Sequence, residues 1–129
     1  MPAPIYNVAI KEDRMIATRD AVADGTLEIQ AANDDVLAIF DLTLAGGTVT
    51  GAVWTLTFDS NSTTGEAVAS TGTVATKAQI KSGATVMISG LTVGVTASGA
   101  GVELDNTSIA SGQTVTLSSA TITHAVDPT

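Results

Sequence analysis

The hydrophobic and polar positions of the chain follow two different periods, and the change between them falls near Gly25. In residues 8–23, Val8, Met15 and Val22 recur at heptad spacing, and charged residues occupy many of the positions between them. This spacing predicts one amphipathic helix over about 8–23. After Gly25, apolar and polar residues alternate, which is the period of a strand with one buried face.

The residues around this helix predict where it begins and ends. Asn7 is placed to cap the first turn, and Gly25 is a natural stop. Residues 1–6, MPAPIY, contain two prolines and predict an extended N-terminal arm. Such an arm fits a disordered end, which is the more common case, or a segment that docks on a neighbouring molecule. The predicted organisation is an arm over 1–6 and one domain over 7–129.

The chain after the helix consists of short strand-like stretches separated by turn residues. The predicted strands lie within residues 26–30, 36–44, 52–59, 67–80, 85–95, 102–109 and 114–123. The stretch 67–80 has room for two strands, and Gly90 interrupts 85–95. This makes about seven to nine short strands with a turn about every ten residues, typical of an antiparallel β-sandwich or barrel. The predicted fold is mainly β, preceded by one N-terminal α-helix.

Two single residues and two stretches of the chain carry more specific predictions. Trp54 lies in a cleanly alternating stretch and is expected as a core anchor rather than a ligand platform. Residues 36–44, VLAIFDLTL, form a nearly continuous apolar run, which favours a strand covered on both faces. Residues 45–51, AGGTVTG, are expected to turn the chain. Gly112 lies in a second expected turn, at a position that suits a positive φ.

Composition and charge narrow the functional classes. A chain of 129 residues has the size of one domain and buries about two-thirds of its unfolded surface on folding. It has no cysteine, so disulfides and thiolate metal sites are excluded. Its formal net charge of -8 argues against nucleic-acid binding, which needs clustered Lys and Arg. The N-terminus has no signal-peptide pattern and no apolar run is long enough for a membrane span, so neither secretion by that route nor a membrane partner is expected.

Patterns of catalytic or metal-binding residues are sparse. His124 is the only histidine and lies near the C-terminus, where a surface role is more common than that of a catalytic base. Asp34 and Asp35 are adjacent and are expected as turn formers. Residues 59–66, DSNSTTGE, loosely resemble a calcium loop that begins at Asp59, but the glycine spacing departs from the EF-hand pattern. An ordinary polar loop is the preferred interpretation, and neither enzyme activity nor a cofactor is expected.

The predicted helix carries Lys11, Arg14 and Arg19, three of the five basic residues of the chain. Acidic residues stand beside them, so an ordinary solvated helix face is the preferred interpretation. The alternative is a docking face for an acidic partner. Together with the arm, these residues make up the candidate interface: Pro2, Pro4, Ile5, Tyr6, Lys11, Arg14 and Arg19.

Two stretches of the chain resemble small structural proteins of tailed bacteriophages. One is DRMIATRDAVADGTLEIQ, residues 13–30, a short helix that runs through glycine into a first strand. The other is GVELDNTSIASGQTVTLSSATIT, residues 101–123, a pair of strands. With the Thr-, Ala- and Gly-rich middle of the chain, the resemblance spans most of the sequence.

The resemblance implies a virion structural protein without catalytic residues, most directly a capsid decoration or cement protein that binds the lattice of the major capsid protein. It also implies assembly in the host cytoplasm, a homo-oligomer, and contacts with the major capsid protein or other virion proteins. A neck, tail or fibre-associated component is the alternative within the virion. An adhesin-like module that binds a cell surface is a further alternative, and the aromatic content of 3% weighs against it.

Overall fold

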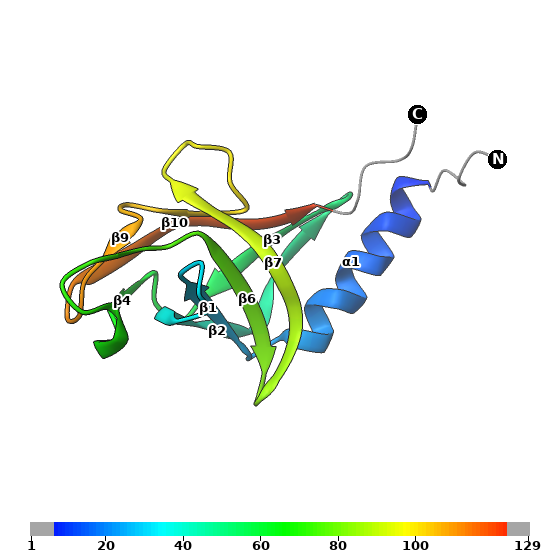
Figure 1. The fold of residues 1–129 in the computed structure, drawn as a ribbon. Helices are drawn as coiled ribbons and strands as arrows, with labels where there is room; N and C mark the ends of the chain where they lie inside the picture. The colour runs from blue at the N-terminus through cyan, green and yellow to red at the C-terminus, as the bar shows by residue number, and fades with distance from the viewer. Residues whose placement is uncertain (1–6, 124–129) are drawn as a thin grey trace.

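The computed structural model describes residues 7–123, in which one helix lies against a β-barrel (Figure 1). Helix α1 spans Val8–Val22, and a short 3-10 helix, η1, spans Ala67–Ala69. The strands are β1 Thr26–Gln30, β2 Val36–Thr50, β3 Val53–Phe58, β4 Ser62–Thr64, β5 Thr73–Val74, β6 Lys77–Ser82, β7 Thr85–Val95, β8 Val102–Leu104, β9 Ser108–Ile109 and β10 Thr114–Thr123. The prediction of a mainly β fold preceded by one helix is confirmed.

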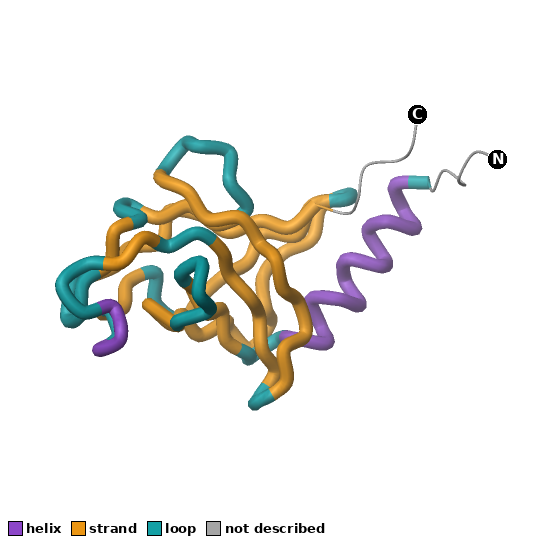
Figure 2. The backbone as a smooth tube through the Cα atoms, viewed as in Figure 1, coloured by secondary structure: helices purple, strands orange, loops and turns teal. Residues whose placement is uncertain are grey.

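The barrel closes because its last strand returns to the second hairpin. Its strand order is β3–β2–β1–β6–β7–β8–β10, and β10 pairs back onto β3 with Ile122 opposite Trp54. Strand β4 pairs with the first residues of β10, and β5 and β9 form a separate two-stranded sheet. Of the two architectures that the sequence favoured, the barrel is therefore the one formed. Figure 2 shows helix α1 outside the barrel and the loops at the ends of its strands.

Among the described residues, neighbouring barrel strands are antiparallel except β7 and β8, which run parallel over Val93–Val95 and Val102–Leu104. The prediction of a fully antiparallel barrel is wrong at this pair. Parallel neighbours usually need a crossover of about a dozen residues or more, but only a short loop joins these two. The Glu103 carboxylate holds this loop by accepting hydrogen bonds from the amide groups of Ala97 at 3.2 Å and Gly99 at 2.9 Å.

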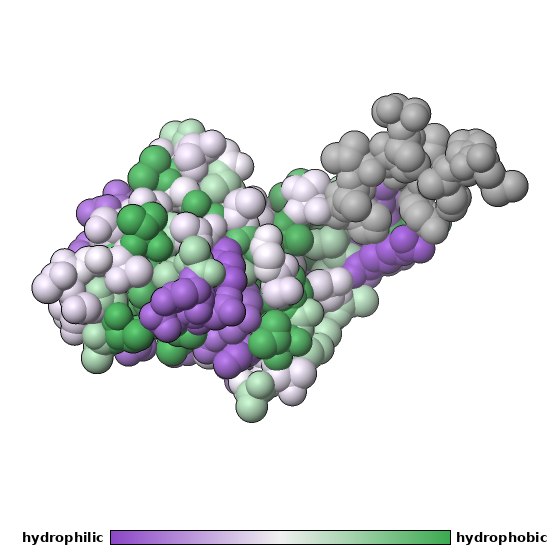
Figure 3. All heavy atoms as spheres, viewed as in Figure 1, coloured by the Kyte–Doolittle hydropathy of each residue, from purple (hydrophilic) through white to green (hydrophobic). Residues whose placement is uncertain are grey.

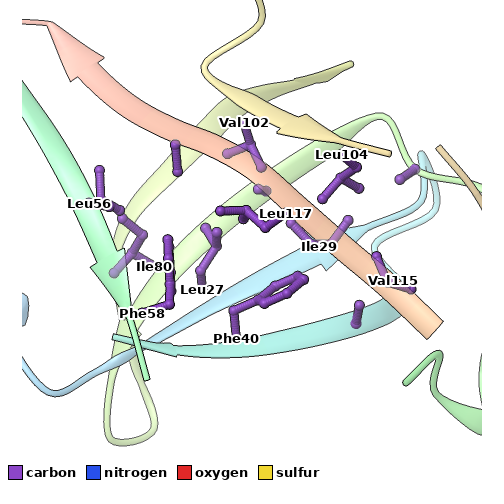
Figure 4. Close-up of a cluster of buried hydrophobic side chains, with 14 of the residues drawn as sticks. Leu27, Ile29, Phe40, Leu56, Phe58, Ile80, Val102, Leu104, Val115 and Leu117 are labelled. Atoms are coloured by element: carbon purple, nitrogen blue, oxygen red, sulfur yellow. The ribbon is translucent and has the colours of Figure 1, made fainter. Parts of the chain in front are cut away.

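Buried side chains from six barrel strands fill the interior (Figure 4). Leu27, Phe40 and Leu117 converge there from β1, β2 and β10. The rings of Phe40 and Phe58 meet edge to face with centroids 6.0 Å apart, a favoured aromatic geometry. Trp54 is fully buried, so its predicted role as a core anchor is confirmed.

Helix α1 begins as predicted, but only part of its predicted apolar face is buried in the core. The Asn7 side chain accepts a hydrogen bond from the Ala9 amide at 2.8 Å, which confirms the N-cap. Met15 and Val22 join the core, but Val8 is exposed, so the predicted heptad face is wrong in the first turn. In Figure 1 the beginning of the helix extends away from the barrel, which explains why its first turn does not reach the core.

The helix stops before the predicted glycine. It ends at Val22, and Asp24 already has a positive φ of 63°. The Gly25 amide then donates to the Val22 carbonyl at 2.9 Å. A Cβ at Gly25 would overlap the main-chain oxygen of Lys81, so this glycine permits close packing against β6 instead of ending the helix.

Strand β2 does not turn where the sequence predicted. It continues through residues 45–50, and the chain turns at Gly51 and Ala52. The pairing between β2 and β3 is irregular between Leu42 and Gly47, where β2 has extra residues. The glycines therefore bend the strand by a bulge and do not end it.

The prediction that the apolar run 36–44 is covered on both faces is correct only for its first residues. Neighbouring Leu37 and Ala38 are both fully buried, but Asp41 is exposed and Leu44 is 80% exposed. A barrel strand presents only one face to the core, and the bulge turns Leu44 outward.

Two of the turn predictions are confirmed. Asp34, with a φ of 75°, and Asp35 lie in the connection between β1 and β2. Gly112, with a φ of 77°, lies in the turn between β9 and β10.

Candidate functional site

Helix α1 is fixed to the β2–β3 hairpin by contacts from two of its charged side chains. The Glu12 carboxylate accepts a hydrogen bond from the Gly51 amide at 2.7 Å. The Arg19 guanidinium donates to the Gly47 carbonyl at 3.3 Å and pairs with Asp20 at 3.1 Å. The helix is therefore joined to the barrel by polar contacts as well as by Met15 and Val22 in the core.

The three predicted interface residues of the helix lie in different environments. Arg14 is exposed, whereas Lys11 and Arg19 are half-buried. Arg19 has an intramolecular role, because it seats the helix on the bulge of β2. The four other predicted interface residues lie outside the described part of the chain: Pro2, Pro4, Ile5 and Tyr6. The assignment of all seven to an interface stays a prediction.

The loop predicted as polar or calcium-binding contains β4 and borders a small pocket. The pocket has a volume of about 90 Å³ and is lined by Ile39, Phe40, Asp41, Asp59, Ser60, Ser62 and Thr63. Asp41 and Asp59 contribute the two carboxylates of this lining, and both residues are exposed. Within residues 7–123, no three acidic or histidine side chains come together as metal ligands. The calcium interpretation therefore gains no support, and His124 lies outside the described residues.

A polar cluster covers the outer face of β1 and β6. Glu28 is buried on this face, where it accepts a hydrogen bond from Gln79 at 2.7 Å and pairs with Lys81 at 3.4 Å. Lys77 pairs with Asp34 of the β1–β2 connection. Figure 3 shows a purple, hydrophilic patch over these elements. Because the charged groups of the cluster pair with one another, this face of the barrel is polar but needs no outside partner.

Strand β7 presents a surface of a different character. No residue between Lys81 and Glu103 is charged, and none of the β7 residues is fully buried although the strand belongs to the barrel. Val86 and Met87 are 46% and 47% exposed. Along β7 the surface in Figure 3 is green or pale, beside the purple patch. The sequence predicted this strand but not its exposure, because a long stretch without charge usually indicates burial.

Comparisons of the chain with family models, curated proteins and solved structures find no match. Among residues 7–123, no helix has the length and apolar character needed to cross a membrane. The β7 surface is the candidate site for contact with another protein, because Val86, Met87 and Val95 are exposed there and no charge lies on the strand.

Proposed function

We propose that this chain is a structural component of a tailed-bacteriophage head, a decoration or cement protein that binds the lattice of the major capsid protein. The proposal begins from the resemblance of residues 13–30 and 101–123 to such proteins. The observation that carries it is the β7 surface, an uncharged strand with Val86, Met87 and Val95 exposed in a chain of net charge -8. Apolar surface of this kind on an acidic protein is suited to burial against another protein.

The rest of the molecule supports this role. A closed barrel with a continuous apolar core is a rigid platform for surfaces that have to fit a lattice. The acidic exterior keeps the protein away from nucleic acid while it assembles in the host cytoplasm. A homo-oligomer presents several copies of the same contact, and weak contacts then add through avidity.

The test is to add purified, labelled chain to DNA-filled heads of the phage that encodes it, after the native copies have been removed. We expect the chain to sediment with the heads, to be distributed over the head lattice in electron micrographs, and to restore resistance to heat. Heads that stay bare of label would overturn the proposal.

The alternatives give different patterns in the same experiment. Label confined to the neck, tail or fibres favours a component of those parts, with the head lattice left bare. Binding of the purified chain to host cells without any particle favours an adhesin-like module.

A further inference from the structure

The first half of β7 is bonded to another strand on one side only. Strand β6 pairs along one edge, whereas β8 reaches the other edge only at Val93–Val95. Within residues 7–123, no main-chain hydrogen bond joins Thr85–Leu91 to any strand except β6. In Figure 1 the β6–β7 hairpin extends as a ribbon toward the bottom of the view. The main-chain groups of Thr85–Leu91 that point away from β6 are therefore available to a further strand.

This open edge lacks the side chains that usually protect an edge strand. Exposed edges are commonly guarded by lysine, proline or an inward charge, and none of these occurs between Lys81 and Glu103. Two bulges interrupt the pairing of β7 with β6, but they bend the strand without adding charge. Val86 and Met87 lie exposed at the beginning of the edge. The edge is therefore uncharged and open, which favours pairing with another chain.

The charge of the molecule favours a second copy of the same chain as the occupant. With a net charge of -8, two copies repel each other wherever their acidic residues face. The open side of β4, for example, is flanked by Asp59 and Glu66. At the β7 edge, two copies approach without placing like charges opposite each other. Antiparallel pairing about a two-fold axis sets the same segment of both copies side by side in opposite directions, so an uncharged edge is complementary to itself.

We propose that Thr85–Leu91 of β7 is a self-association site, at which two copies pair antiparallel about a two-fold axis. This inference does not rest on the proposed function, because it concerns the purified chain alone. The dimer continues the sheet of one barrel into that of its partner and covers the flanks of Val86 and Met87, while the half of β7 with exposed Val95 stays open to a capsid partner.

The test replaces exposed residues of the edge by glutamate and measures the dimer dissociation constant by sedimentation equilibrium. Val86→Glu and Met87→Glu each add a negative charge to this edge in both copies, near the two-fold axis, and are expected to raise that constant by about tenfold or more. The matched control is Val74→Glu on β5, because Val74 is also exposed, at 58%, and lies in the separate two-stranded sheet. The control should dimerise like the unmodified chain, and urea unfolding verifies that all three variants fold.

Hydrogen exchange on the unmodified chain tests the same site without any substitution. The amides of Thr85–Leu91 are expected to exchange more slowly as protein concentration rises, while those of β5 do not change. A chain that stays monomeric at its highest soluble concentration would overturn the proposal. Glutamate variants of β7 that dimerise like the control, or exchange at β7 that is independent of concentration, would also overturn it.

The two proposals can fail separately. A chain that dimerises through β7 but leaves phage heads bare supports this inference and overturns the proposed function. A chain that coats heads but stays monomeric in solution supports the proposed function and overturns self-association through β7.

Discussion

The indole Nε1 of Trp54 donates a hydrogen bond of 3.0 Å to the main-chain carbonyl of Gly46 inside the molecule. Gly46 belongs to the irregular stretch between Leu42 and Gly47, where β2 leaves its regular pairing with β3. A buried carbonyl that loses its strand partner needs another donor. Trp54 therefore completes the bend of β2 as well as filling the core.

Replacement of Trp54 is expected to separate these two contributions. Trp54→Phe keeps most of the apolar volume but leaves the Gly46 carbonyl unpaired, which should lower the free energy of unfolding by about 1–3 kcal/mol. Trp54→Ala also opens a cavity and should cost about 3–5 kcal/mol. Urea unfolding followed by circular dichroism measures both. A Trp54→Ala effect below about 0.5 kcal/mol would contradict the core role and reopen the ligand-platform interpretation.

Gly65 and Gly112 are expected to respond differently to replacement by alanine. A Cβ on Gly65 would overlap the main-chain oxygen of Ala110, so Gly65→Ala should cost about 3 kcal/mol, at the upper end of overpacking effects. A Cβ on Gly112 meets nothing within 4 Å, and only its φ of 77° is unfavourable for alanine. Gly112→Ala should therefore cost about 1–2 kcal/mol. Equal losses in urea unfolding would contradict the close approach at Gly65.

Glu103 is expected to make stability depend on pH in acid. Hydrogen bonds from the amides of Gly99 and Ala97 lower the pKa of its carboxyl group from the ordinary value of 4.5. A lowered folded-state pKa stabilises the fold above the unfolded-state value, and this contribution is lost as the pH falls through the folded-state pKa. Glu103→Gln should therefore lower the urea midpoint at neutral pH, and the difference from the unmodified chain should shrink well below pH 4.5.

The control for this experiment is Glu66→Gln. Glu66 is exposed, and its carboxylate has no hydrogen bond to any residue in the described part of the chain. Its replacement breaks no hydrogen bond and should leave the urea midpoint at neutral pH close to that of the unmodified chain. If Glu103→Gln alters stability by the same amount at both pH values, the hydrogen bonds that hold the β7–β8 loop do not stabilise the ionised form.

Deletion of residues 1–6 is expected to weaken attachment to the phage head more than it weakens folding. The deletion retains Asn7, whose side chain caps helix α1, and every residue of the core cluster. Sedimentation with heads and the urea midpoint provide the two measurements. A variant in which a Gly-Ser stretch of equal length replaces these residues is the control for chain length. Equal loss of attachment and of stability would contradict a docking role for the arm.

Several features of the fold could be predicted because they depend on neighbouring residues. The helix follows from apolar spacing, and its cap follows from the Asn7 side chain. The strand from Thr114 to Thr123 follows from alternation, and the turn at Gly112 from the conformational freedom of glycine. Burial of Trp54 follows from its place in an alternating strand with Leu56 and Phe58. Each of these properties is determined within a few residues of chain.

The choice of a barrel, the parallel pair β7–β8 and the bulge in β2 could not be predicted in this way. Each depends on which strands become neighbours, and β3 and β10, which close the barrel, are distant in the sequence. Strand pairing is set by contacts between such distant segments, which a local pattern does not encode.

The candidate surfaces can likewise be separated into those that the sequence predicted and those that only the tertiary structure revealed. From the sequence alone came the fold class, the helix and a candidate interface at the N-terminal end of the chain. Only the tertiary structure placed Arg19 in an intramolecular contact and exposed β7 at the surface. The runs 36–44 and 85–95 are both rich in apolar residues, yet β2 contributes to the core and β7 has no fully buried residue. Burial is decided by what packs against a strand, and the packing partners are chosen by the fold as a whole.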